Sequence, residues 1–221
     1  MPIPEQQAAP EIPAPPAVVF ERFPAQAATL ARYAGWLAGP GTVRGLLGPR
    51  EVPRLWDRHL LNSLALSELL PAAVRLVDIG SGAGLPGLAL AVARPDLRVD
   101  LVEPLQRRTD FLTEVVEELS LTERVRVVRG RAEDQAVTEL VGGASYLTAR
   151  AVAPLDKLVR LSFPLLVRGG SLLAMKGSSA EDELARHATM LDKAGAEVRG
   201  VVECGIGLIE PPTRVVHLVR H

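Results

Sequence analysis

Several classes of protein are excluded by what this chain of 221 residues has little of. Its only cysteine is Cys204, so an intrachain disulfide and metal sites built on cysteine pairs are impossible, and we expect no bound metal. No apolar run is as long as the roughly 18 residues that a membrane-spanning helix needs. The formal net charge is only −1, so any basic surface for a nucleic acid must be local.

Lysine is also scarce, so almost all of the positive charge is arginine. Guanidinium groups suit planar contacts with phosphates and bases, although the same bias can reflect the composition of a genome. The amino-terminal segment has no basic region followed by an apolar one, as a secretion signal would. These features predict a cytoplasmic, monomeric protein that does not enter a membrane.

Composition and periodicity divide the chain into three parts. Residues 1–17 hold six prolines and no basic residue, which predicts a disordered tail. Residues 18–72 are predicted to be a helical extension, with one helix over about 24–37 and a second over about 51–70. We expect Gly39, Pro40 and Gly41 to end the first helix. Residues 73–221 are predicted to be a Rossmann-like domain.

In that last part, strands alternate with helices, which predicts an α/β fold with a doubly wound parallel sheet. The expected strands cover about 74–79, 99–103, 125–129, 145–149, 170–176, 197–203 and 214–219, and the helices about 85–93, 106–119, 133–141, 154–166 and 180–194. The last two strands have no helix between them, so we expect an antiparallel pair at or near one edge. Seven strands ending in this way are typical of class I methyltransferases.

The most informative segment is the glycine-rich loop after the first strand of this domain. Gly82, Gly84 and Gly87 fit the dinucleotide fingerprint G-x-G-x-x-G, but the register counts against it because Gly80 follows the strand directly. The form acidic-x-G-x-G-x-G, which starts at Asp78, is similar to motif I of methyltransferases that use S-adenosylmethionine. The alternative to a ligand-binding loop is a tight strand-to-helix turn that binds no ligand.

A carboxylate follows at the expected distance. Glu103 ends the next predicted strand, where a ribose diol would lie. Because ligands bind beyond the carboxyl ends of parallel strands, the same rule selects Gly80, Leu85, the turn at 130–134, Arg150 and Lys176.

Further segments make the resemblance specific. The chain resembles the bacterial small-subunit ribosomal RNA guanine-N7 methyltransferase family, RsmG or GidB, over about residues 24–220, and its texture is closest to actinobacterial members. The segments that carry the resemblance are Trp56–Ser63, Val77–Gly87, Glu103–Leu112, Gly130–Glu133 and Ala149–Leu155, with Met175–Gly177 in support. The chain departs from the family at Ala149, where a serine is usual, and at 43–47, where many members carry Asn-Leu-Thr.

The resemblance implies S-adenosyl-L-methionine as cofactor and a guanine in the 530-loop of 16S rRNA as target, within the small ribosomal subunit or an assembly intermediate. It also implies site residues. The cofactor-binding residues would be Gly80, Gly82, Leu85, Glu103, Ala132, Glu133 and Arg150. Arg150 would be the catalytic residue through positioning, at the point where cofactor and base meet.

Four further residues are candidates for substrate contact: Arg107, Arg108, Lys176 and His59. The two arginines lie near a helix start, which is mildly unfavourable and hints at another use. His59 is equally a packed histidine, and Lys176 a solvated one. Ser178 with Glu181 fits a capping box, so we interpret Ser178 as structural.

The implied chemistry needs no general base. Guanine N7 carries an in-plane lone pair, so no proton has to leave, and positioning would supply most of the catalysis. The alternatives are a methyltransferase acting on another RNA, a protein or a small molecule, then a nicotinamide-dependent dehydrogenase, and then a cofactor-binding module without activity.

Overall fold

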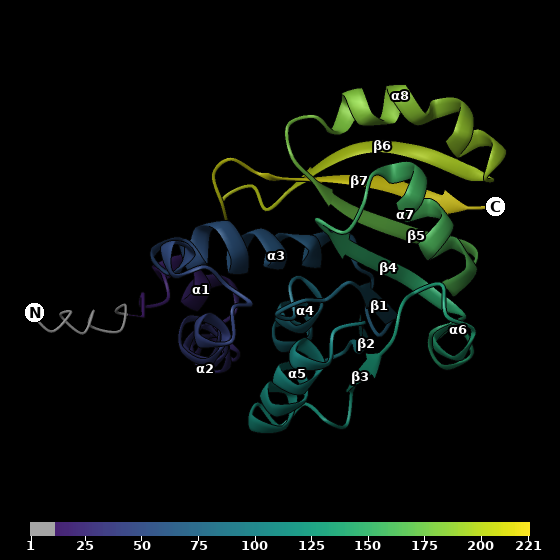
Figure 1. Ribbon diagram of the computed structural model, residues 1–221. Helices are drawn as coiled ribbons and strands as arrows, with labels where there is room; N and C mark the ends of the chain where they lie inside the picture. Colours follow the sequence, from purple (N-terminus) through teal and green to yellow (C-terminus); the bar gives the residue numbers. More distant parts are fainter. Residues whose placement is uncertain (1–11) are drawn as a thin grey trace, which may run out of the picture.

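A seven-stranded sheet lies between two layers of helices in the computed structural model, which describes residues 12–221 (Figure 1). In chain order the strands are β1 (Arg75–Ile79), β2 (Arg98–Glu103), β3 (Val125–Arg129), β4 (Ala144–Arg150), β5 (Leu166–Lys176), β6 (Ala196–Cys204) and β7 (Thr213–Arg220). They are arranged in the order β3-β2-β1-β4-β5-β7-β6. The first five strands pair in parallel, and β7 pairs antiparallel with both β5 and β6.

This arrangement confirms the predicted fold class. The chain starts in the middle of the sheet at β1, runs outward to β3 and returns to β4 on the other side of β1. The order therefore reverses between β1 and β4, and ligands of doubly wound sheets bind beyond the strand ends at such a point. The expected antiparallel pair is formed by β6 and β7, with β6 at the edge.

Each face of the sheet has its own core. The helices are α1 (Ala17–Arg22), α2 (Ala27–Trp36), α3 (Asn62–Leu64), α4 (Gly87–Ala93), α5 (Gln106–Glu118), α6 (Gln135–Val141), α7 (Leu155–Ser162) and α8 (Ala180–Lys193). Apolar side chains of α1 to α5 pack on one face, and those of α6 to α8 pack on the other (Figure 1). In β1, Leu76 faces the first core while Val77 and Ile79 face the second, as the two-residue repeat of a strand requires.

The helical extension belongs to the first core. Leu30 of α2 and Leu60 are fully buried in the same cluster as Leu88 of α4 and Leu101 of β2. The extension therefore packs directly on the sheet, and its position relative to the strand ends is set by apolar burial.

The predicted tail reaches into the described part of the chain. Residues 1–11 lie outside the described residues, whereas Pro13 lies against the extension, where its carbonyl accepts a hydrogen bond from the indole of Trp56 (2.9 Å). The first helix, α1, begins at Ala17, one residue before the predicted start of the helical extension at residue 18.

Two predicted helices are irregular in the structure. The regular helix α2 ends at Trp36, close to the predicted end, and the chain continues into a π-helical turn, η1 (Leu37–Gly41), because Pro40 has no N–H for a regular turn. The predicted helix over 51–70 is a run of four short pieces. They are the 3-10 helix η2 (Pro49–Arg54), the π-helix η3 (Leu55–Leu61), α3 and the 3-10 helix η4 (Ala65–Leu69). Pro53 lies inside the first piece and prevents a continuous α-helix there.

Two smaller predictions were wrong. The helix expected over 154–166 ends at Ser162 and is followed by the short 3-10 helix η5 (Phe163–Leu165), since Pro164 cannot continue it. The capping box is absent, because no side chain caps α8 at its N-cap residue, Ser179. Glu181 instead pairs with Arg214 of β7, which also donates to the carbonyl of Ser178.

Among residues 12–221, no helix combines the length and the apolar character that crossing a bilayer requires.

Candidate active site

The glycine loop leaves β1 in a conformation that only glycine adopts easily. Gly80 and Gly82 have φ values of +65° and +59°, and Gly84 has +96°. The N–H of Gly80 donates to the carbonyl of Val102 (2.8 Å), which ties the loop to β2. A Cβ added at Gly84 would lie 2.7 Å from the Tyr33 hydroxyl, so neighbouring side chains also exclude a larger residue there.

Asp78 holds the base of this loop. Its fully buried carboxylate accepts hydrogen bonds from the N–H of Gly87, the first residue of α4, and from the hydroxyl of Thr148 on β4 (both 3.1 Å). Burial raises the pKa of Asp78 to about 6, although these hydrogen bonds oppose the shift. These hydrogen bonds show that Asp78 orients the loop.

Glu103 lies directly beside the loop. Its buried carboxylate accepts hydrogen bonds from the N–H groups of Gly82 (2.9 Å) and Leu105 (3.0 Å). Arg108, in the first turn of α5, approaches the same carboxylate at 3.7 Å, whereas Arg107 is exposed. The structure thus brings Glu103 and Gly82 together and places Arg108 on their side of the site.

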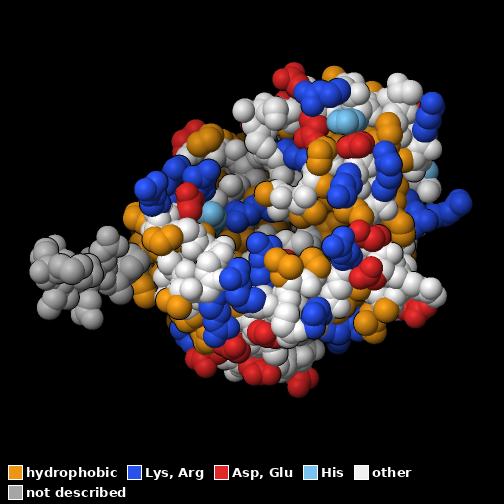
Figure 2. Space-filling model, viewed as in Figure 1, with side chains coloured by type: hydrophobic (Ala, Val, Ile, Leu, Met, Phe, Trp, Pro, Cys, Tyr) orange, Lys and Arg blue, Asp and Glu red, His pale blue; other side chains and the backbone are white. Residues whose placement is uncertain are grey.

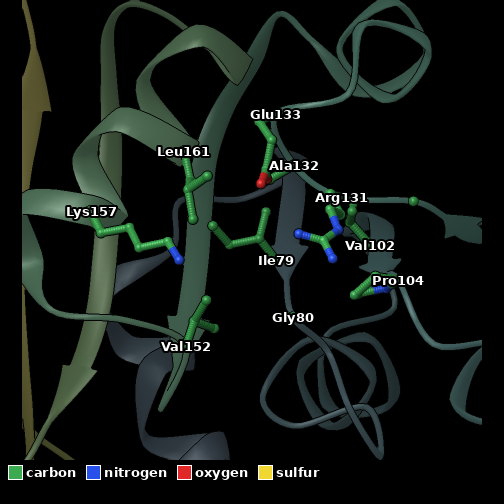
Figure 3. A pocket seen from close by; sticks show the side chains of 11 residues that line it. Ile79, Gly80, Val102, Pro104, Arg131, Ala132, Glu133, Val152, Lys157 and Leu161 are labelled. Atoms are coloured by element: carbon green, nitrogen blue, oxygen red, sulfur yellow. The ribbon is translucent and has the colours of Figure 1, made fainter.

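A cavity of about 160 Å³ opens next to these residues, beyond the ends of β1, β2 and β3 (Figure 3). Its lining residues are Ile79, Gly80, Val102, Pro104, Gly130, Arg131, Ala132, Glu133, Val152, Lys157 and Leu161. Ile79, Val152 and Leu161 give it an apolar wall, and Glu133 reaches toward it from the opposite side. A narrow space with apolar walls and a few polar groups fits a planar heterocycle such as adenine.

Leu85, which stays a predicted cofactor-binding residue, lies below the loop. Its side chain is buried in the core beneath the loop, and its N–H donates to the carbonyl of Ser81 (3.1 Å). It does not line the cavity that contains Gly80, Ala132 and Glu133.

Arg150 ends β4, on the other side of the switch point. Its guanidinium contacts Nδ1 of His59 through Nη2 (3.1 Å) and the carbonyl of Arg58 through Nη1 (3.5 Å). Burial lowers the pKa of Arg150, while the nearby Tyr33 and Asp78 raise it. The contact therefore brings two predicted site residues, Arg150 and His59, together from positions 91 residues apart.

Next to Arg150 lies a recess of about 320 Å³. Its lining residues are Asn62, Arg150, Ala151, Met175, Lys176, Gly177 and Thr213. Four of them, Asn62, Lys176, Gly177 and Thr213, also line a larger hollow of about 450 Å³. We call these two adjoining spaces the acceptor groove. Three arginines, Arg54, Arg58 and Arg214, line its outer part, together with acidic residues. Figure 2 shows Lys and Arg side chains gathered around a hollow on this face.

Lys176 lies in this groove but is held by other groups. Its ammonium donates to the carbonyl of Ala153 (2.9 Å) and to the carboxylate of Glu183 (3.0 Å). It is separated from Arg107 and Arg108, because β1 and β4 lie between the end of β2 and the end of β5. The four candidate substrate residues therefore lie at separate points along the strand-end edge.

Sequence reasoning missed several residues of the site. Glu51 accepts a hydrogen bond from His59, Tyr33 donates its buried hydroxyl to the carbonyl of Ala83 (2.7 Å), and Asn62 contacts Thr213. The contacts of Tyr33 and Asn62 join the extension to distant segments, and that of Glu51 lies within the irregular helices of the extension. No local sequence motif therefore indicates any of them.

Comparison with known proteins gives a consistent picture. Residues 26–210 match the family described as GidB, rRNA small subunit methyltransferase G. The ribosomal RNA small subunit methyltransferase G of Salinispora arenicola is 56% identical over 195 residues, which cover 85% of this chain and 79% of that protein. The protein of the same name from Corynebacterium jeikeium is 51% identical over 211 residues, which cover 96% and 94%.

Solved structures agree in fold. Aeropyrum pernix fibrillarin, solved with bound S-adenosyl-L-methionine, has a TM-score of 0.55 at 22% identity, covering 72% of this chain and 76% of that one. The mitomycin 7-O-methyltransferase MmcR has a TM-score of 0.56 at 19% identity, covering 93% and 76%. At these identities the likeness shows the class I methyltransferase fold alone.

Proposed function

This chain belongs to the rRNA small subunit methyltransferase G family, and on that premise we propose that it methylates N7 of a guanine in the 530-loop of 16S rRNA. It is an S-adenosylmethionine-dependent rRNA methyltransferase. One observation carries the proposal: beside the switch point of the sheet, a cavity suited to adenine is lined by Gly80 of the glycine loop, and a separate groove is lined by Arg150 at the end of the neighbouring strand β4.

The residues of the cavity and the neighbouring Glu103 fit the cofactor. We propose that the cavity holds the adenine ring, with Ala132 and Glu133 beside it, and that Glu103 holds the ribose hydroxyls. Each carboxylate oxygen has two lone pairs, so Glu103 can accept a hydrogen bond from a ribose hydroxyl while it keeps its hydrogen bond from Gly82. When bound, S-adenosylmethionine supplies an activated methyl group.

The residues of the acceptor groove fit a purine nucleotide. We propose that the acceptor groove admits the guanine, since its inner recess contains an amide at Asn62, a hydroxyl at Thr213 and the guanidinium of Arg150. Guanidinium donors suit the O6 atom that neighbours N7. The arginines along the outer groove suit the phosphates of the flanking RNA.

The chemistry that remains for the chain is positioning. N7 attacks with its own lone pair, so no side chain has to remove a proton. Holding the base in a reactive geometry is then the main contribution, and a displacement of about 1 Å can reduce the rate by about 100-fold. In this account Arg150 holds the base. We assign it to the base and not to the cofactor, for which the resemblance also suggested it, because it lines the groove and not the cavity. Residues 18–72 close the substrate side of the site.

The substrate we propose is the small subunit or an assembly intermediate, on which a monomer acts in the cytoplasm. The test is transfer of a tritiated methyl group to 30S subunits from a strain that lacks the enzyme. We expect label at guanine N7 within the 530-loop. Label at another nucleotide would overturn the assigned target and keep the rRNA methylation, whereas label on a protein alone would overturn both.

A further inference from the structure

A chain of two hydrogen bonds connects Arg150 to the helical extension. His59 lies in the π-helix η3, and its side chain is only 12% exposed. One ring nitrogen, Nδ1, lies 3.1 Å from Nη2 of Arg150, and the other, Nε2, lies 2.8 Å from a carboxylate oxygen of Glu51. The ring thus bridges a cation on β4 and an anion in η2.

The chemistry of the partners assigns the proton on the ring. A guanidinium group can only donate, so Nδ1 of His59 must carry a lone pair. A carboxylate can only accept, so Nε2 must carry the proton. The geometry therefore requires the neutral Nε2–H tautomer, in which Arg150 donates to His59 and His59 donates to Glu51.

We propose that His59 is a positioning residue, whose neutral Nδ1 holds the guanidinium of Arg150 at the acceptor groove. The role rests on the proposed function of Arg150 as the group that positions the base. It also gives the helical extension a direct part in catalysis, because Glu51 orients His59 and both residues belong to the extension.

The charges around the ring favour this neutral form. Burial lowers the pKa of His59, and the cations Arg150 and Arg58 lower it further, whereas Glu51 raises it. Behind Arg150 lie Tyr33 and Asp78. A proton added to Nδ1 would remove the acceptor and place two cations 3.1 Å apart. We therefore expect methyl transfer to fall as the pH is lowered through the pKa of His59.

Two substitutions separate the contacts of the ring. The amide of His59→Asn reaches about as far as Nδ1, so its oxygen can accept from Arg150, but it cannot titrate. The longer amide of His59→Gln reaches toward Nε2 and Glu51, and it leaves Arg150 without its acceptor. Both variants remove the imidazole, so a difference between them reports which contact matters.

The experiment measures methyl transfer to 30S subunits from pH 5 to pH 8.5, together with cofactor affinity and thermal stability. We expect His59→Asn to stay within a few-fold of wild type at neutral pH and to lose the decline that His59 causes at acidic pH. We expect His59→Gln to fall by about 100-fold with cofactor affinity retained. Asp78, with a pKa of about 6, is a second group that could cause a decline at acidic pH. If the decline persists unchanged in His59→Asn, then His59 does not cause it, and the proposal is overturned.

Nitrogen NMR of the imidazole gives a readout that does not depend on activity. Comparison with His59→Asn assigns the signal among the four histidines, and we expect the Nε2–H tautomer at neutral pH. Equal activity of the two variants, or the other tautomer, would overturn the role of His59 alone. A wild type that labels no 30S guanine would instead overturn the proposed function, and the role of His59 in it.

Discussion

The cofactor side and the substrate side of the strand-end edge differ in how far apart in the sequence their contacting residues lie. On the cofactor side, at β1, β2 and β3, backbone N–H groups hold Glu103, and the hydrogen bond from the N–H of Gly82 to Glu103 spans only 21 residues. On the substrate side, at β4, β5 and β7, side chains meet across the chain. Arg150 contacts His59 over 91 residues, and Thr213 contacts Asn62 over 151. The hydrogen bonds that join Glu103 to the glycine loop are thus local in the sequence, whereas these contacts of the substrate side form only after the extension has packed.

The largest effect we expect comes from a substitution in the glycine loop at Gly84, which is crowded and has a positive φ. In Gly84→Ala, the new Cβ would lie 2.7 Å from the Tyr33 hydroxyl and 2.8 Å from Cβ of Leu88, at a φ of +96°. Left-handed strain and overpacking together predict a loss of about 4 kcal/mol in the free energy of unfolding, measured with urea. Gly143→Ala is the control, because its φ is +78° but nothing lies within 4 Å of its Cβ. Strain alone predicts a loss of about 1 kcal/mol there. Equal losses would show that packing against the extension does not constrain the loop.

A second substitution tests the carboxylate below the loop. The pKa of Asp78 is raised from 3.8 to about 6, mainly by burial, so the folded state binds its proton more tightly than the unfolded state. The free energy of unfolding therefore falls as the pH rises from about 4 to above 6 and Asp78 loses its proton, by up to roughly 3 kcal/mol. We expect the difference in unfolding free energy between wild type and Asp78→Asn to shift against wild type by this amount over that range. A difference that is independent of pH would contradict the assignment.

The smallest effect concerns the two arginines at the start of α5. Arg108 approaches Glu103 at 3.7 Å and is partly exposed, whereas Arg107 is exposed. We expect Arg108→Ala to weaken cofactor binding by less than about 1 kcal/mol, or up to fivefold, and Arg107→Ala to leave it unchanged. Calorimetric titration with cofactor measures both. If both variants instead lose RNA methylation and keep cofactor affinity, the pair belongs to the RNA surface that the sequence predicted.

The difference between the halves also explains what could be predicted from the sequence. The strands, the glycine loop and the position of Glu103 at the end of β2 could be predicted because apolar runs, clustered glycines and a short spacing all leave local patterns. The irregular helices were predicted as regular ones, because the apolar spacing does not show how the backbone adapts to Pro40 and Pro53. The capping box at Ser178 failed because Glu181 has a competing partner, Arg214, which the sequence places 33 residues away.

The substrate side could be predicted only through resemblance to a family. His59 and Arg150 were both candidates, but their contact depends on the packing of the extension against β4. Glu51 carried no signal of its own, because a carboxylate in a short irregular helix is common. Lys176 was correctly placed at the end of β5, while its ion pair with Glu183 depends on α8.

The central claim is that the two halves do separate work, and one paired measurement tests it most directly. Cofactor affinity and methyl transfer to 30S subunits are measured side by side for Glu103→Ala and Arg150→Ala, with Arg107→Ala as the exposed control. We predict that Glu103→Ala loses cofactor binding, and that Arg150→Ala keeps it within a few-fold while transfer falls by about 100-fold. Loss of cofactor affinity in Arg150→Ala equal to that in Glu103→Ala would contradict the division.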